Sequence, residues 1–314
     1  MYISIDKAVE FLKAGEVVAV PTETVYGLAA SLEHPEAIKR VYQLKGRPSS
    51  NPLIIHVNNA DEINKYVTEL PDGFSLLANA FWPGPLTLVL PANIDAVPEI
   101  VRAGLHTAAF RVPRHLLARQ LLRLTGPLVM PSANLSGTPS STLIDHVEQD
   151  FGSDFPVLEG ASCAIGLEST ILVHTHGQWQ IIRQGALAAR DFEGILGYQP
   201  HVSGPESYTA PLCPGQLFRH YAPKAKLMLR KEFSMAHGEI ILGFSDKKYP
   251  EGNRIINLGI SSNPSEIAEK LYKTLRSLDD NHISSALVDI DLPKTGLYLT
   301  ILERLYKAAA GLDR

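Results

Sequence analysis

A long stretch without periodicity, residues 199–224, sets the limits on how this chain can fold, because it separates two regions of regular pattern. The stretch is rich in Pro, Gly, Ser and Tyr, and it has neither the period of a helix nor that of a strand. Compact domains rarely contain an irregular segment of this length, so it indicates a linker. We therefore divide the 314 residues into a domain at 1–198, the linker 199–224 and a smaller domain at 225–314.

Short apolar runs alternate with amphipathic segments on both sides of the linker. Before it, PLIIHV, TLVLPA and STILVHT predict buried strands, and HLLARQLLRL predicts a helix. Their order is irregular rather than a strict βαβ repeat, which predicts an α/β domain with a twisted mixed sheet. After the linker, AKLMLR, EIILGFS and ISSALVDIDL alternate with helical segments, so this part predicts a small Rossmann-like α/β domain.

The bulk properties exclude several classes of protein. A formal net charge of -4 gives no overall attraction to nucleic acid. The two cysteines, Cys163 and Cys213, lie far apart without CxxC spacing, which favours neither a zinc site nor a disulfide framework. The N-terminal residues carry charges throughout and no apolar run is long enough for a membrane span, so we expect a cytoplasmic protein. A P-loop, a nucleophile elbow and an HExxH zinc motif are all missing from the sequence.

Polar residues gather next to the predicted strands of the first domain. PTETVYGLAA places Thr22, Glu23 and Thr24 directly after a strand, where open α/β sheets bind ligands, although a capped turn explains the segment equally well. KGRPSSN places Lys45 and Arg47 on a rigid turn that suits a polyphosphate, with a solvated basic turn as the alternative.

Three further segments carry charged and hydroxyl groups. In FRVPRH, Arg111 lies within an apolar strand and needs an anionic partner, either a protein carboxylate or a ligand. PSANLSGTPSST follows a strand and precedes a helix, an arrangement that favours anion binding but is also ordinary turn chemistry. GLESTILV places Glu168 and Ser169 before a strand, and IIRQG places Arg183 within the next.

Taken in order, seven segments of the chain resemble the threonylcarbamoyl-AMP synthase family and its YrdC-like fold. They are PTETVYGL, KGRPSSNPLIIHV, FWPGPLTLVL, FRVPRH, PSANLSGTPSST, GLESTILV and IIRQG. The linker motif PGQLFRHYAP and the C-terminal part resemble the long, two-domain form of that family. The resemblance implies an enzyme that condenses L-threonine, bicarbonate and ATP to threonylcarbamoyl-AMP and pyrophosphate, a nucleotidyltransferase reaction that serves tRNA modification.

The resemblance also implies a role for each matching residue. Lys45 and Arg47 would be the catalytic cations. The threonine site would comprise Thr24, His56, Arg111, Ser132 and Ser169. The ATP site would comprise Arg47, Asn51, Thr107, Asn134, Thr142, Arg183 and Tyr221, the last as a lid from the linker.

The same resemblance sets the expected cofactor and partners. We expect no tightly bound cofactor and no protein-held metal, with Mg²⁺ arriving on ATP because the sequence shows no carboxylate cluster. The product would pass to a separate tRNA threonylcarbamoyl transferase complex, with no membrane and little direct contact with tRNA. Two alternatives stay open, an RNA-binding module and a carbamoyl-transfer enzyme like the hydrogenase-maturation proteins that share this fold.

Overall fold

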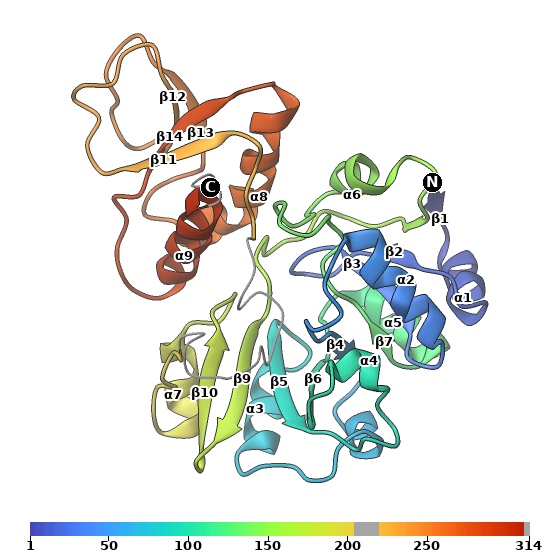
Figure 1. The fold of residues 1–314 in the computed structure, drawn as a ribbon. Coiled ribbons are helices and arrows are strands. Elements are labelled where there is room, and N and C mark those ends of the chain that lie inside the picture. Colours follow the sequence, from blue (N-terminus) through green and yellow to red (C-terminus); the bar gives the residue numbers. More distant parts are fainter. Residues whose placement is uncertain (204–219, 311–314) are drawn as a thin grey trace.

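The computed structural model describes residues 1–203 and 220–310. They form a large N-terminal domain and a small C-terminal domain, drawn from orange to red in Figure 1. The greater part of the predicted linker, residues 204–219, lies outside the described residues, and so does Cys213. Within the described ranges, no helix has the length and apolarity needed to cross a membrane.

The large domain is built on one mixed sheet. Its strands are β1 (Tyr2–Ile3), β2 (Val18–Val20), β3 (Gly27–Ser31), β4 (Ile54–His56), β5 (Leu86–Pro91), β6 (Thr107–Arg111), β7 (Leu128–Val129), β8 (Val157–Leu158), β9 (Thr170–Thr175) and β10 (Gln178–Arg183). They lie in the order β1-β8-β2-β3-β7-β4-β6-β5-β9-β10. Some neighbouring strands are parallel, such as β4–β6, and others are antiparallel, such as β5–β6, which confirms the predicted mixed sheet.

Helices and 3-10 turns cover this sheet. They are α1 (Ile5–Lys13), α2 (Pro35–Lys45), α3 (Phe74–Phe81), α4 (Glu99–Arg102), α5 (Leu116–Thr125), α6 (Ile144–Phe151), α7 (Glu193–Leu196) and the 3-10 turns Asp61–Lys65 and Ala189–Phe192. In α2 the buried residues Ala37, Ile38 and Val41 recur at helical spacing and join the main core. The helix begins at Pro35 and ends at Lys45, followed by the cap residue Gly46, whose left-handed φ of 59° favours glycine.

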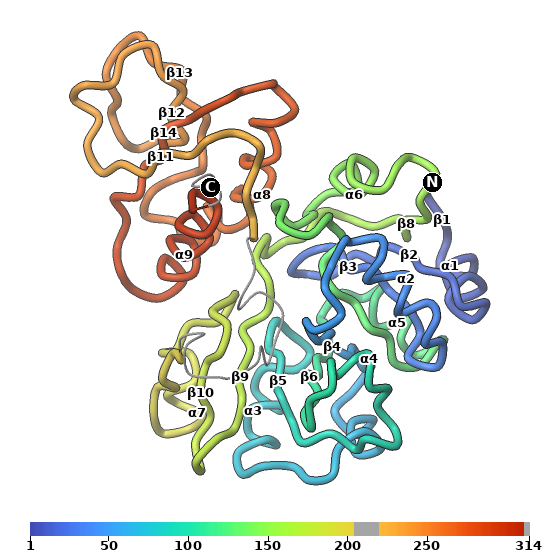
Figure 2. Tube along the Cα trace, viewed as in Figure 1, coloured from blue at the N-terminus to red at the C-terminus, as the bar shows by residue number. Residues whose placement is uncertain are grey.

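The small domain has a parallel sheet of Rossmann type. Its strands are β11 (Lys226–Arg230), β12 (Ile240–Gly243), β13 (Arg254–Asn257) and β14 (Ser285–Asp289), and its helices are α8 (Pro264–Asp280) and α9 (Leu297–Ala309). The order β11-β14-β12-β13 arises because β13–α8–β14 crosses back over the sheet. Figure 2 shows α8 and α9 on the side of this domain that faces the large one. The predicted small α/β domain is confirmed.

Candidate active site

One pocket collects most of the polar residues that the sequence singled out. The large domain contributes the side chains that line it from strand ends and loops, and the end of the linker contributes two aromatic ones. The lining comprises Thr24, Val25, Lys45, Arg47, Ile54, His56, Arg111, Met130, Pro131, Ser132, Asn134, Ser136, Gly137, Thr138, Ser140, Glu168, Ser169, Arg183, His220 and Tyr221.

The parallel pairing of β4 with β6 brings two of these side chains together. His56 and Arg111 are direct register partners at the ends of their strands. Both are almost fully buried. Burial and, after it, the neighbouring Arg111 charge hold the pKa of His56 well below its ordinary value, so its imidazole is neutral at pH 7. His56 therefore offers hydrogen bonds rather than charge.

Arg111 has a protein carboxylate as its partner. Its Nη2 donates to Glu23 Oε1 at 2.6 Å, its Nη1 to Thr24 Oγ1 at 2.9 Å and its Nε to the Gly84 carbonyl at 3.3 Å. Burial alone would raise the pKa of Glu23, but the charge and hydrogen bond of Arg111 outweigh it, and the pKa lies below its ordinary value. Of the two partners that the sequence left open for Arg111, the structure contains the carboxylate.

The loop between β2 and β3 separates the roles of its two threonines. Thr24 lines the pocket and Thr22 does not. The Thr22 hydroxyl lies 2.6 Å from the Val25 carbonyl and 2.9 Å from the Thr24 hydroxyl. Thr22 thus shapes the turn, while Thr24 presents its hydroxyl to Arg111 and the pocket.

The end of α2 supplies two cations. Lys45 is buried, and its Nζ donates to the carbonyls of Ser132 and Asn134. Burial, then the nearby Arg47 charge, holds the pKa of Lys45 well below its ordinary value. The Arg47 guanidinium donates to the carbonyls of Asn51 and Pro52. These carbonyl contacts fix the direction of both side chains.

The start of β9 and the end of β10 form another wall. Arg183 donates from Nη2 to the Ser169 hydroxyl at 3.0 Å and to its carbonyl at 2.9 Å. The Ser169 hydroxyl also lies 2.7 Å from that of Thr87. Asn134 also lines the pocket, and its Oδ1 is buried without a hydrogen-bond partner in the described part of the chain. An acceptor left in this way is suited to a ligand donor.

The linker returns to the pocket at its C-terminal end. Tyr221 is buried and has a left-handed φ of 68°. Its ring stacks on Tyr272 of α8, with centroids 5.3 Å apart, and the Arg304 guanidinium of α9 lies 4.7 Å from the ring centre. The small domain therefore holds in place a side chain that lines the pocket.

Most residues assigned from the sequence meet in this pocket, namely Lys45, Arg47, Thr24, His56, Arg111, Ser132, Ser169, Asn134, Arg183 and Tyr221. Three lie outside its lining. Thr107 begins β6, at the end opposite Arg111. The Thr142 amide donates to His146, and the Asn51 carbonyl accepts from Arg47. The contacts with ATP assigned to these three residues stay predictions.

Two carboxylates of the site received no role from the sequence. Glu23 holds Arg111, and Glu168 lines the pocket and binds the small domain. Both residues belong to motifs described in the sequence analysis, and what the sequence could not predict is which residues they contact. Those partners lie 88 and 136 residues away along the chain, a separation at which no local pattern gives a signal.

Comparison with known proteins connects both domains with one family. Residues 10–185 match the family model described as "Telomere recombination", and residues 187–310 match the one described as "Threonylcarbamoyl-AMP synthase, C-terminal domain". A threonylcarbamoyl-AMP synthase of Pyrococcus abyssi is 37% identical over 96% of this chain and 93% of its own length. One of Bacillus subtilis is 36% identical over 98% and 93%.

Solved structures agree with these matches. The crystal structure of P. abyssi Sua5 complexed with L-threonine has a TM-score of 0.89 at 32% identity, covering 99% of this chain and 98% of that one. E. coli YciO has a TM-score of 0.53 at 22% identity, covering 59% and 94%, which supports the fold of the large domain alone.

Proposed function

Because the chain belongs to the threonylcarbamoyl-AMP synthase family in its long two-domain form, we propose that it is the enzyme that condenses L-threonine, bicarbonate and ATP. The products are threonylcarbamoyl-AMP and pyrophosphate, a nucleotidyl transfer. The observation that carries the proposal is one pocket of the described residues, whose lining combines Lys45, Arg47, Arg111 and Arg183 with hydroxyl and amide groups.

In this proposal Arg111 receives the carboxylate of threonine. A guanidinium has five N–H donors, and the described contacts with Glu23, Thr24 and Gly84 use three of them. The remaining two can bind a carboxylate in the forked geometry that arginine favours. Thr24, Ser132, Ser169 and the neutral His56 surround the same substrate.

Lys45, Arg47 and Arg183 bind the phosphates, with Lys45 and Arg47 as the catalytic cations. The threonine amine combines with carbon dioxide from bicarbonate to give a carbamate and releases a proton. A carbamate oxygen then forms a bond to the α-phosphorus while the bond to pyrophosphate breaks. This step requires positioning and charge neutralisation, which fixed cations supply, rather than a protein nucleophile.

We also propose that Mg²⁺ enters on the phosphates of ATP. In residues 1–203 and 220–310, no group of three or more His, Cys, Asp or Glu side chains is placed to hold a metal ion. The Glu168 carboxylate in the lining is held by Arg304 and Tyr272, while the donors that face the pocket are cations, amides and hydroxyls, which bind phosphate oxygens rather than the ion. Bound there, Mg²⁺ would neutralise charge on the leaving pyrophosphate.

We propose further that the product passes to a tRNA threonylcarbamoyl transferase complex in the cytoplasm.

The test is pyrophosphate release by the purified full chain from ATP, with L-threonine and bicarbonate each omitted in turn. Release that needs all three, together with threonylcarbamoyl-AMP identified by mass spectrometry, supports the proposal. Release unchanged when either is left out contradicts it, and salt-sensitive binding of bare RNA without turnover favours the RNA-binding alternative.

A further inference from the structure

Two helices of the small domain direct side chains onto the outer wall of the pocket. Tyr272 and Arg276 lie four residues apart on α8, and Thr300 and Arg304 lie four residues apart on α9. This spacing places each pair on one face of its helix. The approach of α8 is so close that a Cβ added to Gly166, which has a φ of 75°, would lie 2.4 Å from the Ala268 carbonyl oxygen.

Glu168 is the point at which both helices meet the pocket. Its carboxylate accepts from Tyr272 at 2.9 Å and from the Arg304 Nε at 3.2 Å, both from the small domain. It also accepts from the Ser140 hydroxyl at 2.7 Å, on the pocket loop. Burial would raise the pKa of Glu168, but Arg304, then Arg183, and the Ser140 hydrogen bond lower it to about 2. The group is a buried, ionised carboxylate whose positive partner comes from another domain.

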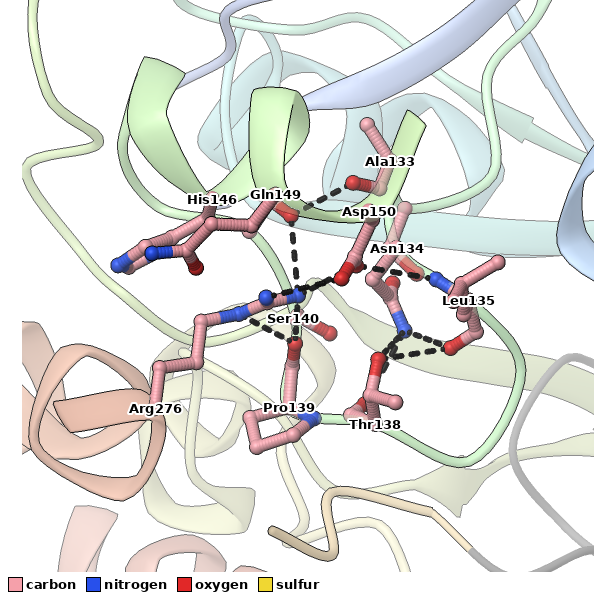
Figure 3. Close-up of polar contacts among 12 residues, drawn as sticks. Ala133, Asn134, Leu135, Thr138, Pro139, Ser140, His146, Gln149, Asp150 and Arg276 are labelled. Atoms are coloured by element: carbon pink, nitrogen blue, oxygen red, sulfur yellow. Dashed lines mark hydrogen bonds and ion pairs between the residues drawn. The ribbon is translucent and has the colours of Figure 1, made fainter. Parts of the chain in front are cut away.

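Arg276 holds the same pocket loop from outside. Its guanidinium donates to the Pro139 carbonyl at 2.7 Å and to Asp150 Oδ2 at 2.7 Å, as Figure 3 shows. Asp150 in turn accepts from the Leu135 amide at 3.1 Å. The loop that carries Asn134 and Ser140 is thus held between α6 and α8.

From these contacts we propose that Glu168 is a positioning residue of the pocket and that Tyr272 and Arg304 of the small domain act on nucleotide binding through it. The proposal rests on the function proposed above. It gives the small domain a defined part in the reaction, although that domain contributes neither of the catalytic cations.

The physical reason is charge. Glu168 lines a pocket proposed to bind a polyphosphate, and it directly precedes Ser169, to which Arg183 is bound. Arg304 compensates the charge of the Glu168 carboxylate, and Tyr272 donates a hydrogen bond to it. These two contacts hold the carboxylate where it accepts from the Ser140 hydroxyl. Without them, an uncompensated anion would repel the phosphates and draw Arg183 away from them.

The test uses the full chain and steady-state kinetics of pyrophosphate release. Tyr272→Phe removes one hydroxyl and keeps the ring that stacks on Tyr221. Tyr298→Phe is its matched control, since that hydroxyl bonds the Ser261 carbonyl within the small domain, away from the pocket. We expect Tyr272→Phe to raise the KM for ATP about tenfold, as for the loss of one hydrogen bond to a charged group, and Tyr298→Phe to leave it unchanged.

A charge-removal pair separates positioning from folding. Arg304→Met should raise the KM for ATP more than Tyr272→Phe does, and adding Glu168→Gln should lower it again because the uncompensated charge is gone. Enzyme that has irreversibly lost its fold lowers the maximum rate and leaves KM unchanged, whereas reversible unfolding would raise the apparent KM, so the comparison is made between variants that are fully folded. Circular dichroism at the assay temperature verifies that each variant is folded.

The two proposals fail in different ways. If the wild type releases no pyrophosphate with threonine and bicarbonate, the proposed function is wrong. If the wild type is active but Tyr272→Phe matches Tyr298→Phe, or Glu168→Gln fails to rescue folded Arg304→Met, the positioning role of Glu168 is overturned.

Discussion

Arg111 and Glu23 form an ion pair with 2.6 Å between Nη2 and Oε1, and both side chains are buried at the pocket wall. A buried pair of this kind loses hydration on both sides, so its two members depend on each other. Arg111 therefore has a structural role as well as the proposed contact with threonine.

Replacing Arg111 tests both roles. Arg111→Ala should abolish turnover and also destabilise the fold by about 3–5 kcal/mol, since Glu23 is left buried without its partner. Adding Glu23→Gln should recover part of the stability, measured by urea unfolding, but not the turnover. Near-normal turnover in the double variant would show that Arg111 does not bind the substrate.

Lys45 should make ATP binding depend on pH. Burial and Arg47 depress its pKa in the free protein, and phosphates beside it would raise that pKa again. Binding is then strongest where Lys45 is already protonated. As pH rises above the depressed pKa, the lysine must take up a proton on binding, and affinity falls by up to about tenfold per pH unit.

Isothermal titration with ATP at several pH values measures this effect. Lys45→Met removes the titrating group, so its weaker affinity should be independent of pH, and its turnover should fall by about 10²-fold or more. The same slope with pH in both proteins would assign the dependence to another group.

Glu168 should couple stability to acid. Its pKa is about 2 in the folded protein against an ordinary value of 4.5, so its contribution is fully present above pH 4.5 and is lost as pH falls toward 2. The shift corresponds to about 3 kcal/mol. Urea midpoints of wild type and Glu168→Gln should differ at pH 7 and converge progressively as pH falls from 4.5 toward 2, and a constant difference would contradict this assignment.

Sequence patterns predicted the helix in HLLARQLLRL and the two kinds of sheet, because long amphipathic segments and β-branched runs carry their structure locally. They missed β3, whose sequence GLAAS contains no β-branched residue. It is a strand because β2 and β7 pair with it on either side. At Gly27 an added Cβ would lie 2.9 Å from the Met130 Cβ, so a close contact formed only in the fold decides that residue.

In the candidate site, too, some features follow from local sequence and others from contacts that form only in the fold. Its cations and hydroxyls were predictable because they stand in compact motifs beside strand ends. The contacts of Tyr221 could not be predicted, because Tyr272 and Arg304 belong to separate helices that come together at Tyr221 only in the folded protein.

The contacts of Tyr221 with Tyr272 and Arg304 lead to a prediction for Tyr221 itself. Tyr221→Phe keeps both the stacking on Tyr272 and the cation–π contact with Arg304, so its kinetics should stay close to wild type. Tyr221→Ala removes the ring and should raise the KM for ATP about tenfold and change the rate of product release. Unchanged ATP affinity and product release in Tyr221→Ala would show that this side chain is no lid.

Thr22 and Thr24 offer a comparison within one turn. Thr24 Oγ1 accepts from Arg111 and lines the pocket, whereas Thr22 Oγ1 closes the turn onto the Val25 carbonyl. Thr24→Val should raise the KM for threonine about tenfold, because Arg111 loses an acceptor and the substrate loses a hydroxyl partner.

Thr22→Val is nearly isosteric and should act on stability instead. It leaves the buried carbonyl of Val25 without that donor, at a cost of about 1–3 kcal/mol in the free energy of unfolding. Its KM for threonine should stay within about twofold of wild type, since about 0.4 kcal/mol corresponds to that factor. The opposite result, a raised KM in Thr22→Val and a normal one in Thr24→Val, would mean that Thr22 contacts threonine, through a rearranged turn that brings its hydroxyl into the pocket.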